Sequence, residues 1–192
     1  MKKLLALLLA LTLCATAAFA EEGVFDYTVF EENEDIDLEI DNFDKSWSIS
    51  ISTFDETFTG FSAQGTLDGK VEMAGLIFVG DNCDEVKVLL DDTMYTFNTR
   101  MQEVVLDLGG CLITLTPETE SFFQALATAE SVDIRLTTAG GEDIDTSITG
   151  SDLEEIQFVL TELFTQDVMN CYTEDGKDTW DTADLLQPMT VD

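Results

Sequence analysis

Residues 36–51 read IDLEIDNFDKSWSISI, and this stretch contains two runs in which apolar and polar side chains alternate. In residues 36–40 two isoleucines and a leucine alternate with acids, and in residues 47–51 a tryptophan and two isoleucines alternate with serines. A period of two places successive side chains on opposite faces of a strand. Each run therefore predicts a β-strand with one buried and one solvated face.

Similar runs follow along most of the chain, and short connectors rich in glycine or aspartate separate them. Asp68-Gly69, Asp91-Asp92, Gly109-Gly110 and Gly140-Gly141 have the composition of hairpin turns. The further predicted strands are Val24 to Phe30, Thr57 to Ala63, Val71 to Val79, Val86 to Leu90, Met94 to Thr99, Val104 to Leu108, Leu112 to Leu115, Val132 to Thr138 and Asp143 to Thr149.

Two segments have helical signals instead. Thr116 is predicted to cap a helix that opens with Pro117 and runs to about Ala129. A second helix is predicted after Ser151-Asp152-Leu153-Glu154, which has the spacing of a capping box. Apolar residues at helical spacing predict the buried faces of the two helices. They are Phe122, Phe123 and Leu126 in the first helix, and Leu153, Ile156, Leu160, Leu163 and Phe164 in the second.

Many short strands joined by tight turns, without regular alternation of strand and helix, favour antiparallel sheets. We therefore predict an α+β fold that is mainly antiparallel β, with a β-sandwich-like or curled sheet and two covering helices. Residues 21–172 are expected to form a single acidic β-rich domain, and residues 173–192 a polar C-terminal tail.

Residues 1–20 have the organisation of a signal peptide. Two lysines follow the first residue, residues 4–13 are almost entirely apolar, and residues 18–20 read AFA, which suits a signal peptidase. The apolar run is too short to span a membrane, which takes about 20 residues, and none follows it. Lipidation at Cys14 is disfavoured because a bulky leucine precedes it. We expect a secreted bacterial protein, extracellular or periplasmic.

The charge of the chain limits its partners. The chain has 8 basic and 40 acidic residues; two lysines leave with the leader, so six bases remain and the net charge changes from −32 to −34. Nucleic acids need a basic surface that displaces counterions, so we expect no nucleic acid partner. A protein or carbohydrate partner fits better, and its predicted contact surfaces are the acidic edge from Glu31 to Asp41 and the tail around Trp180.

The residue types exclude several chemistries. The chain has no histidine, so neither a Ser-His-Asp triad nor a Cys-His pair can form. It also contains no glycine-rich phosphate-binding loop. We therefore assign no catalytic, cofactor-binding or metal residues. A carboxylate-dependent hydrolase of the glycosidase type remains the alternative, because it needs only two suitably spaced acids.

Weak calcium binding is a further expectation, and a calcium-stabilised domain the third hypothesis. Residues 174–181 are acid-rich and contain a glycine turn, as calcium loops do. With Gly176 at loop position six, however, positions one, three and twelve fall on Cys171, Thr173 and Thr182, none of which is an acid. Residues 81–82 and 142–145 are similarly incomplete, so no cofactor is predicted.

Cys83, Cys111 and Cys171 remain after removal of the leader, an odd number for an oxidising compartment. If the strands starting at 86, 94 and 104 form a meander, Cys83 and Cys111 lie on the order of 20 Å apart. A disulfide requires Cα atoms within roughly 7 Å, so this pair is disfavoured. Cys171 pairs with either neighbour, or all three are reduced and buried.

These observations favour a non-catalytic binding or protein-interaction module over the hydrolase and the calcium-stabilised domain. Arg135, on the outer side of a predicted strand, is expected to form a surface ion pair with a nearby carboxylate, an interaction that contributes little to stability.

Overall fold

The computed structural model describes residues 23–53, 58–79, 83–99, 110–138, 140–177, 183–185 and 188–191. The predicted leader, the predicted strand at 104–108 and Trp180 lie outside these ranges.

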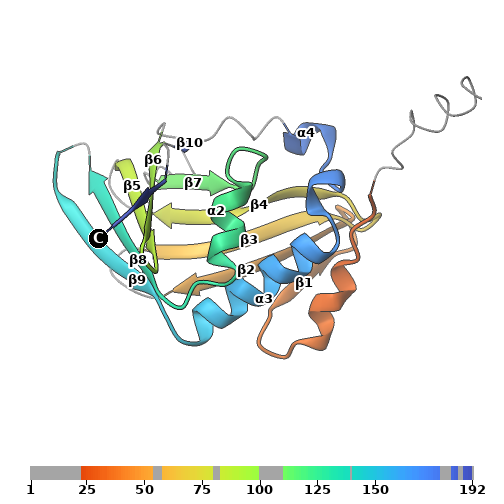
Figure 1. The fold of residues 1–192 in the computed structure, drawn as a ribbon. Coiled ribbons are helices and arrows are strands. Elements are labelled where there is room, and N and C mark those ends of the chain that lie inside the picture. Colours follow the sequence, from red (N-terminus) through yellow and green to blue (C-terminus); the bar gives the residue numbers. More distant parts are fainter. Residues whose placement is uncertain are drawn as a thin grey trace, which may run out of the picture.

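The strands form two antiparallel sheets (Figure 1). The first sheet has the order β1-β2-β3-β4-β7. Its strands are β1 (Leu38–Asp41), β2 (Ser46–Thr53), β3 (Phe58–Thr66), β4 (Val71–Val79) and β7 (Gly110–Thr114). The second sheet has the order β10-β6-β5-β8-β9, and β11 also pairs with β6. Its strands are β5 (Cys83–Leu90), β6 (Thr93–Thr99), β8 (Val132–Thr138), β9 (Asp143–Ile148), β10 (Ala183–Leu185) and β11 (Met189–Thr190).

The two longer helices lie side by side over one face of the first sheet (Figure 1). They are α2 (Glu120–Leu126) and α3 (Ser151–Thr165). The shorter elements are the 3₁₀ helices η1 (Tyr27–Glu32) and η2 (Val168–Asn170) and the single turn α4 (Glu174–Lys177). The predicted α+β fold, mainly antiparallel with a sandwich-like arrangement and covering helices, is confirmed.

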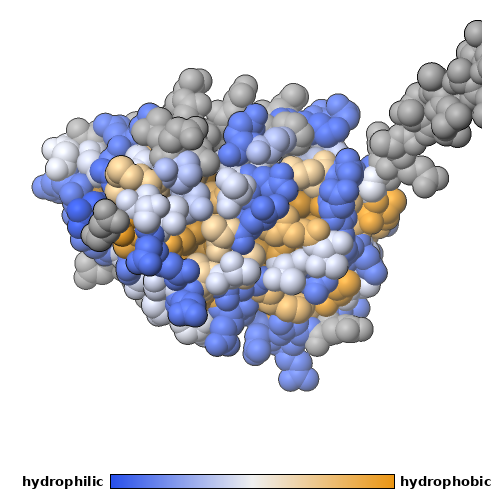
Figure 2. All heavy atoms as spheres, viewed as in Figure 1, coloured by the Kyte–Doolittle hydropathy of each residue, from blue (hydrophilic) through white to orange (hydrophobic). Residues whose placement is uncertain are grey.

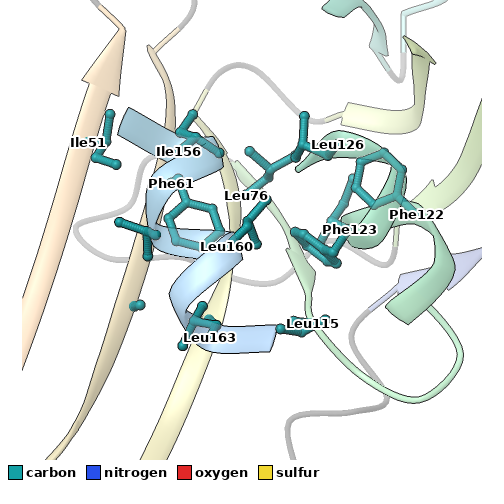
Figure 3. Packing of buried hydrophobic residues seen from close by; sticks show 14 of the residues in the cluster. Ile51, Phe61, Leu76, Leu115, Phe122, Phe123, Leu126, Ile156, Leu160 and Leu163 are labelled. Carbon is teal, nitrogen blue, oxygen red and sulfur yellow. The ribbon is translucent and has the colours of Figure 1, made fainter. Parts of the chain in front are cut away.

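The core lies between the helices and the sheets. Figure 3 shows Ile156, Leu160 and Leu163 of α3 facing strand residues such as Phe61 and Leu76. Seen from the helix side, hydrophobic residues gather in the middle and hydrophilic residues surround them (Figure 2). Of the alternating residues predicted to face inward, Leu38, Ile144 and Thr146 are only half-buried and Ile40 is exposed. Most of the others are buried. They include Trp47, Ile49 and Ile51 in β2, Val132, Ile134 and Leu136 in β8, Ile148 in β9, and Phe122, Phe123 and Leu126 in α2.

The connection after β6 differs from the predicted meander. Strand β7 pairs with β4 of the first sheet, with Gly110 opposite Val79 and Cys111 opposite Phe78. Gly110 therefore belongs to a strand and not to a hairpin turn. The separation estimated for Cys83 and Cys111 assumed the meander, so that argument against their pairing no longer holds.

The segment 24–30 was predicted to be a strand, which is wrong, because much of it forms η1. Asp26 is the N-cap of this helix, and its carboxylate accepts hydrogen bonds from the backbone N–H of Thr28, at 3.1 Å, and from the Thr28 hydroxyl, at 2.6 Å. Such local bonds compete with strand pairing. Phe25, just before this helix, and Phe30 within it lie near the Trp47 indole, with ring centroids 5.5 and 6.2 Å away.

Both predicted helix starts also need correction. The N-cap of α3 is Gly150, with φ 63°, and no side chain caps the helix, so the capping box at Ser151 does not form. Helix α2 begins at Glu120 with Thr119 as its N-cap. Thr116 lies in the turn before it, where its N–H donates to the Thr119 hydroxyl at 2.9 Å.

The segment predicted as a polar tail contributes elements to the fold. Strands β10 and β11 both pair with β6, at opposite ends of that strand. Within the described ranges, no helix combines the length and the apolar character needed to cross a membrane.

Candidate interaction surface

The hairpin formed by β1 and β2 has a turn that local hydrogen bonds to an aspartate side chain hold in place. The Asp41 carboxylate accepts hydrogen bonds from the N–H groups of Phe43, at 2.7 Å, and of Asp44, at 3.1 Å. Lys45 closes the turn with a positive φ of 59°. This pattern is an Asx turn, in which an aspartate side chain replaces a backbone acceptor. The position of the turn therefore does not depend on packing of the Phe43 ring.

Phe43 is 97% exposed at the tip of this hairpin. It is the only aromatic among the large apolar residues that are exposed in the described part of the chain, and Ile40, three residues away, is 41% exposed. Single exposed apolar residues are common. A phenylalanine held fully in solvent beside a second apolar residue is a stronger indication of a contact surface, because aromatic residues dominate binding hot spots.

The hairpin also borders an open hollow of about 690 Å³. We call its lining the hairpin surface. The residues of this surface are Glu39, Ile40, Asp41, Asn42, Phe43, Ser46 and Ser48. Asp37 and Asp44 are exposed next to it, and Lys45 is the only base between residues 36 and 48. The surface therefore combines an apolar tip with strongly negative surroundings.

This location agrees in part with the predicted contact surfaces. The acidic edge from Glu31 to Asp41 runs from the end of η1 into β1, and it shares Glu39, Ile40 and Asp41 with the hairpin surface. Phe43 was not predicted as a contact residue. The sequence did contain a signal for this residue, because Phe43 is an aromatic residue among turn residues and lies between the alternating runs 36–40 and 47–51.

A second concave area lies on the outer face of the second sheet, with a volume of about 320 Å³. Its lining contains Lys87 and Arg135, which lie opposite each other in the β5–β8 pair. As predicted, Arg135 finds a carboxylate: its Nε and Nη2 donate to Asp145 at 2.6 and 2.7 Å. The hydrogen bond and charge of Arg135 lower the pKa of Asp145. Lys87 lies 2.6 Å from Glu85.

Because acids already compensate both cations, this groove has no excess positive charge for an anionic ligand. Arg135 is additionally 3.9 Å from Asp143. The ion pair between Arg135 and Asp145 is exposed and contributes little to stability.

Three acids meet where α3 approaches the N-terminal segment. Burial raises the pKa of Glu155, and the negative charges of Asp152 and Asp35 raise it further. Relative to the unfolded chain, the folded protein therefore shifts the Glu155 carboxyl towards its protonated form.

Glu155→Gln is expected to raise the Tm at pH 7, on the order of 2 °C. The folded state raises the pKa of Glu155 above its unfolded value of about 4.3, so ionisation costs stability as the pH rises through that window. The gain should fade when the pH falls below the unfolded-state value. Thermal unfolding from pH 4 to 8 measures this, with Glu162→Gln on the same helix as control. An equal gain in both variants would attribute the effect to net charge alone.

No group of three or more cysteines and acids is placed to hold a metal ion in the described ranges. In the predicted incomplete calcium segment 142–145, Asp143 and Asp145 contact Arg135, and Asp143 also accepts a hydrogen bond from the Thr137 hydroxyl at 2.8 Å.

Cys171 is a free, buried thiol. Burial and the charge of Asp167 raise the pKa of this thiol, although Lys70 acts in the opposite direction. A raised pKa keeps the sulfur protonated and poorly nucleophilic. The structure bears out the reduced and buried state for Cys171, which is the one cysteine whose side chain it describes.

Comparison with known protein families, curated proteins and solved structures finds no match for this chain.

Proposed function

We propose that this protein is a secreted, non-catalytic interaction module that binds a basic protein through the hairpin surface. The observation that carries the proposal is the 97% exposure of Phe43 on a turn that the Asp41 carboxylate fixes. An aromatic anchor on a fixed turn loses little conformational freedom on binding. Its burial in a partner's pocket therefore contributes to affinity with a small entropic cost.

The charge of the protein supports a basic partner. The chain carries 40 acids against 8 bases, and the hairpin surface adds Glu39 and Asp41 next to Phe43. Complementary charge steers encounter and excludes acidic competitors. A carbohydrate partner has less support, because sugar sites usually offer several aromatic faces, whereas the hairpin surface has one.

Two alternatives can be separated from this proposal with the same purified protein. A calcium-stabilised domain requires a higher Tm in millimolar calcium than in chelator. A carboxylate-dependent hydrolase requires turnover of a polysaccharide or ester panel that depends on one carboxyl group. Glu155, with its raised pKa, is the first carboxyl group to replace in that assay.

Phe43→Ala is expected to weaken binding of a basic peptide by about tenfold or more, since hot-spot aromatics contribute at least about 2 kcal/mol. The probe is a fluorescent dodecapeptide of alternating lysine and valine, measured by anisotropy at physiological salt. The matched control is Met189→Ala, which removes another exposed apolar side chain on the second sheet. Equal affinities for the wild type and Phe43→Ala would contradict the proposal, as would equal weakening in both variants.

A further inference from the structure

We infer that the partner contacts the outer edge of β1 with an extended segment in which basic and apolar residues alternate. This inference rests on the proposed function and specifies the partner's binding element. In the described part of the chain, the first sheet ends at β1, which pairs with β2 alone. An exposed edge offers unpaired backbone groups that an extended peptide can join as an additional strand.

The two faces of β1 determine which side chains such a strand needs. Glu39 and Asp41 pair with Ser48 and Ser46, on the solvated face of the sheet. Leu38 and Ile40 pair with Ile49 and Trp47, on the face that the core covers. Side chains of an added strand alternate in the same way. Basic residues would therefore lie beside the acids, and apolar residues beside Leu38 and Ile40.

The charge on this edge favours a different chain over a second copy. Two β1 edges would bring Glu39 and Asp41 of one molecule close to the same acids of the other, and like charges across a sheet are destabilising. The acids therefore protect the edge against self-association while they attract a basic strand.

The β9 edge of the second sheet differs from β1 in this respect. On β9, Asp143 and Asp145 are already engaged by Arg135 and Thr137. On β1, no ion pair or hydrogen bond to another described residue engages the Glu39 carboxylate. Of the two edges, β1 is the one whose acid is available to a basic partner.

Hydrogen exchange of the full-length protein with the alternating lysine-valine dodecapeptide tests the inference. Strand addition predicts slower exchange for amides within Leu38–Asp41 in the complex. The control peptide has the same composition, but its lysines and valines follow one another in twos (KKVV), which destroys the alternation. Strand addition predicts that the alternating peptide binds at least about tenfold more tightly than this control. Binding that protects no amide of β1, or equal affinity for both peptides, would overturn strand addition.

These results are distinguishable from failure of the proposed function. If Phe43→Ala weakens binding while no β1 amide is protected, the interaction module stands and strand addition fails. If neither effect is seen, both fail.

A charge reversal provides a second test on the folded protein. Glu39→Lys is expected to weaken binding of the alternating peptide about tenfold, since it replaces attraction by repulsion at the edge. Glu142→Lys is the matched control, because it makes the same change in net charge at another exposed turn. Equal effects of the two reversals would assign binding to overall charge and overturn the inference. Sedimentation of the protein alone should show a monomer, and a dimer in which the amides of Leu38–Asp41 exchange more slowly would assign the edge to a second copy.

Discussion

Trp47→Ala should lower the free energy of unfolding by about 3–5 kcal/mol, the range for removal of a buried large aromatic residue. The indole is 1% exposed and lies against the rings of Phe25, Tyr27 and Phe30. Its loss leaves a cavity at the contact between β2 and the N-terminal segment. For a chain of this length, the Tm should fall by about 10 °C. Urea unfolding followed by circular dichroism, together with a thermal melt, measures both quantities.

Trp47→Phe is the control that separates packing from hydrogen bonding. Among the described residues, the buried indole Nε1 has no hydrogen-bond partner. An unsatisfied buried donor is itself unfavourable, so the phenylalanine variant loses volume but removes that penalty. We expect a cost under about 1.5 kcal/mol. A loss as large as that of Trp47→Ala would show that the N–H group has a stabilising contact.

Gly75→Ala should destabilise the protein by about 1–3 kcal/mol, although alanine adds only one methyl group. Gly75 lies in β4 opposite Thr114 of β7. A Cβ at this position would overlap the carbonyl oxygen of Ile113 and lie 3.1 Å from the Ile113 carbonyl carbon and the Thr114 Cα. These are backbone atoms, so β7 would have to move away from β4.

The matched control for this substitution is Gly140→Ala, in the turn between β8 and β9. The nearest atom to a Cβ there is the Thr138 hydroxyl oxygen, at 3.6 Å, which is ordinary contact. The free energy of unfolding of this variant should lie within about 0.5 kcal/mol of the wild-type value. Comparable losses in the two variants would mean that β7 does not approach β4 as closely as described.

The strand periodicity of the sequence predicted much of this fold, because one face of most strands is buried. Val71–Val79 and Val132–Thr138 were predicted with the bounds that the structure has. The alternation identifies a strand and its inner face, but it contains no information about the neighbouring strand. The pairing of β7 with β4 joins segments that are distant in sequence, so the alternation could not predict it, and the expected meander was wrong for that reason.

The other errors arose where a local interaction or a backbone conformation replaced the expected one. Alternation at Phe25, Tyr27 and Val29 resembles a strand, yet the bonds between Asp26 and Thr28 favour a 3₁₀ helix there. At α3, Gly150 adopts a positive φ and takes the N-cap position that Ser151 was expected to fill.

The candidate surface was predictable only in part. Charge density identified the acidic edge that leads into β1, because a run of acids without bases remains in solvent. The exposure of Phe43 could not be derived, because a phenylalanine in a turn can also fold back onto the core. The Asx turn at Asp41 and the left-handed Lys45 determine that it does not.

The pairing of β6 with both β10 and β11 affects when the chain can complete its folding. Thr93 at one end of β6 pairs with Thr190, and Thr99 at the other end pairs with Ala183. During synthesis the early part of the chain emerges first, so β6 lacks these neighbours until the last segments are released. Contacts this distant in sequence also form slowly. The second sheet is therefore complete only after residues 183–190 have joined β6.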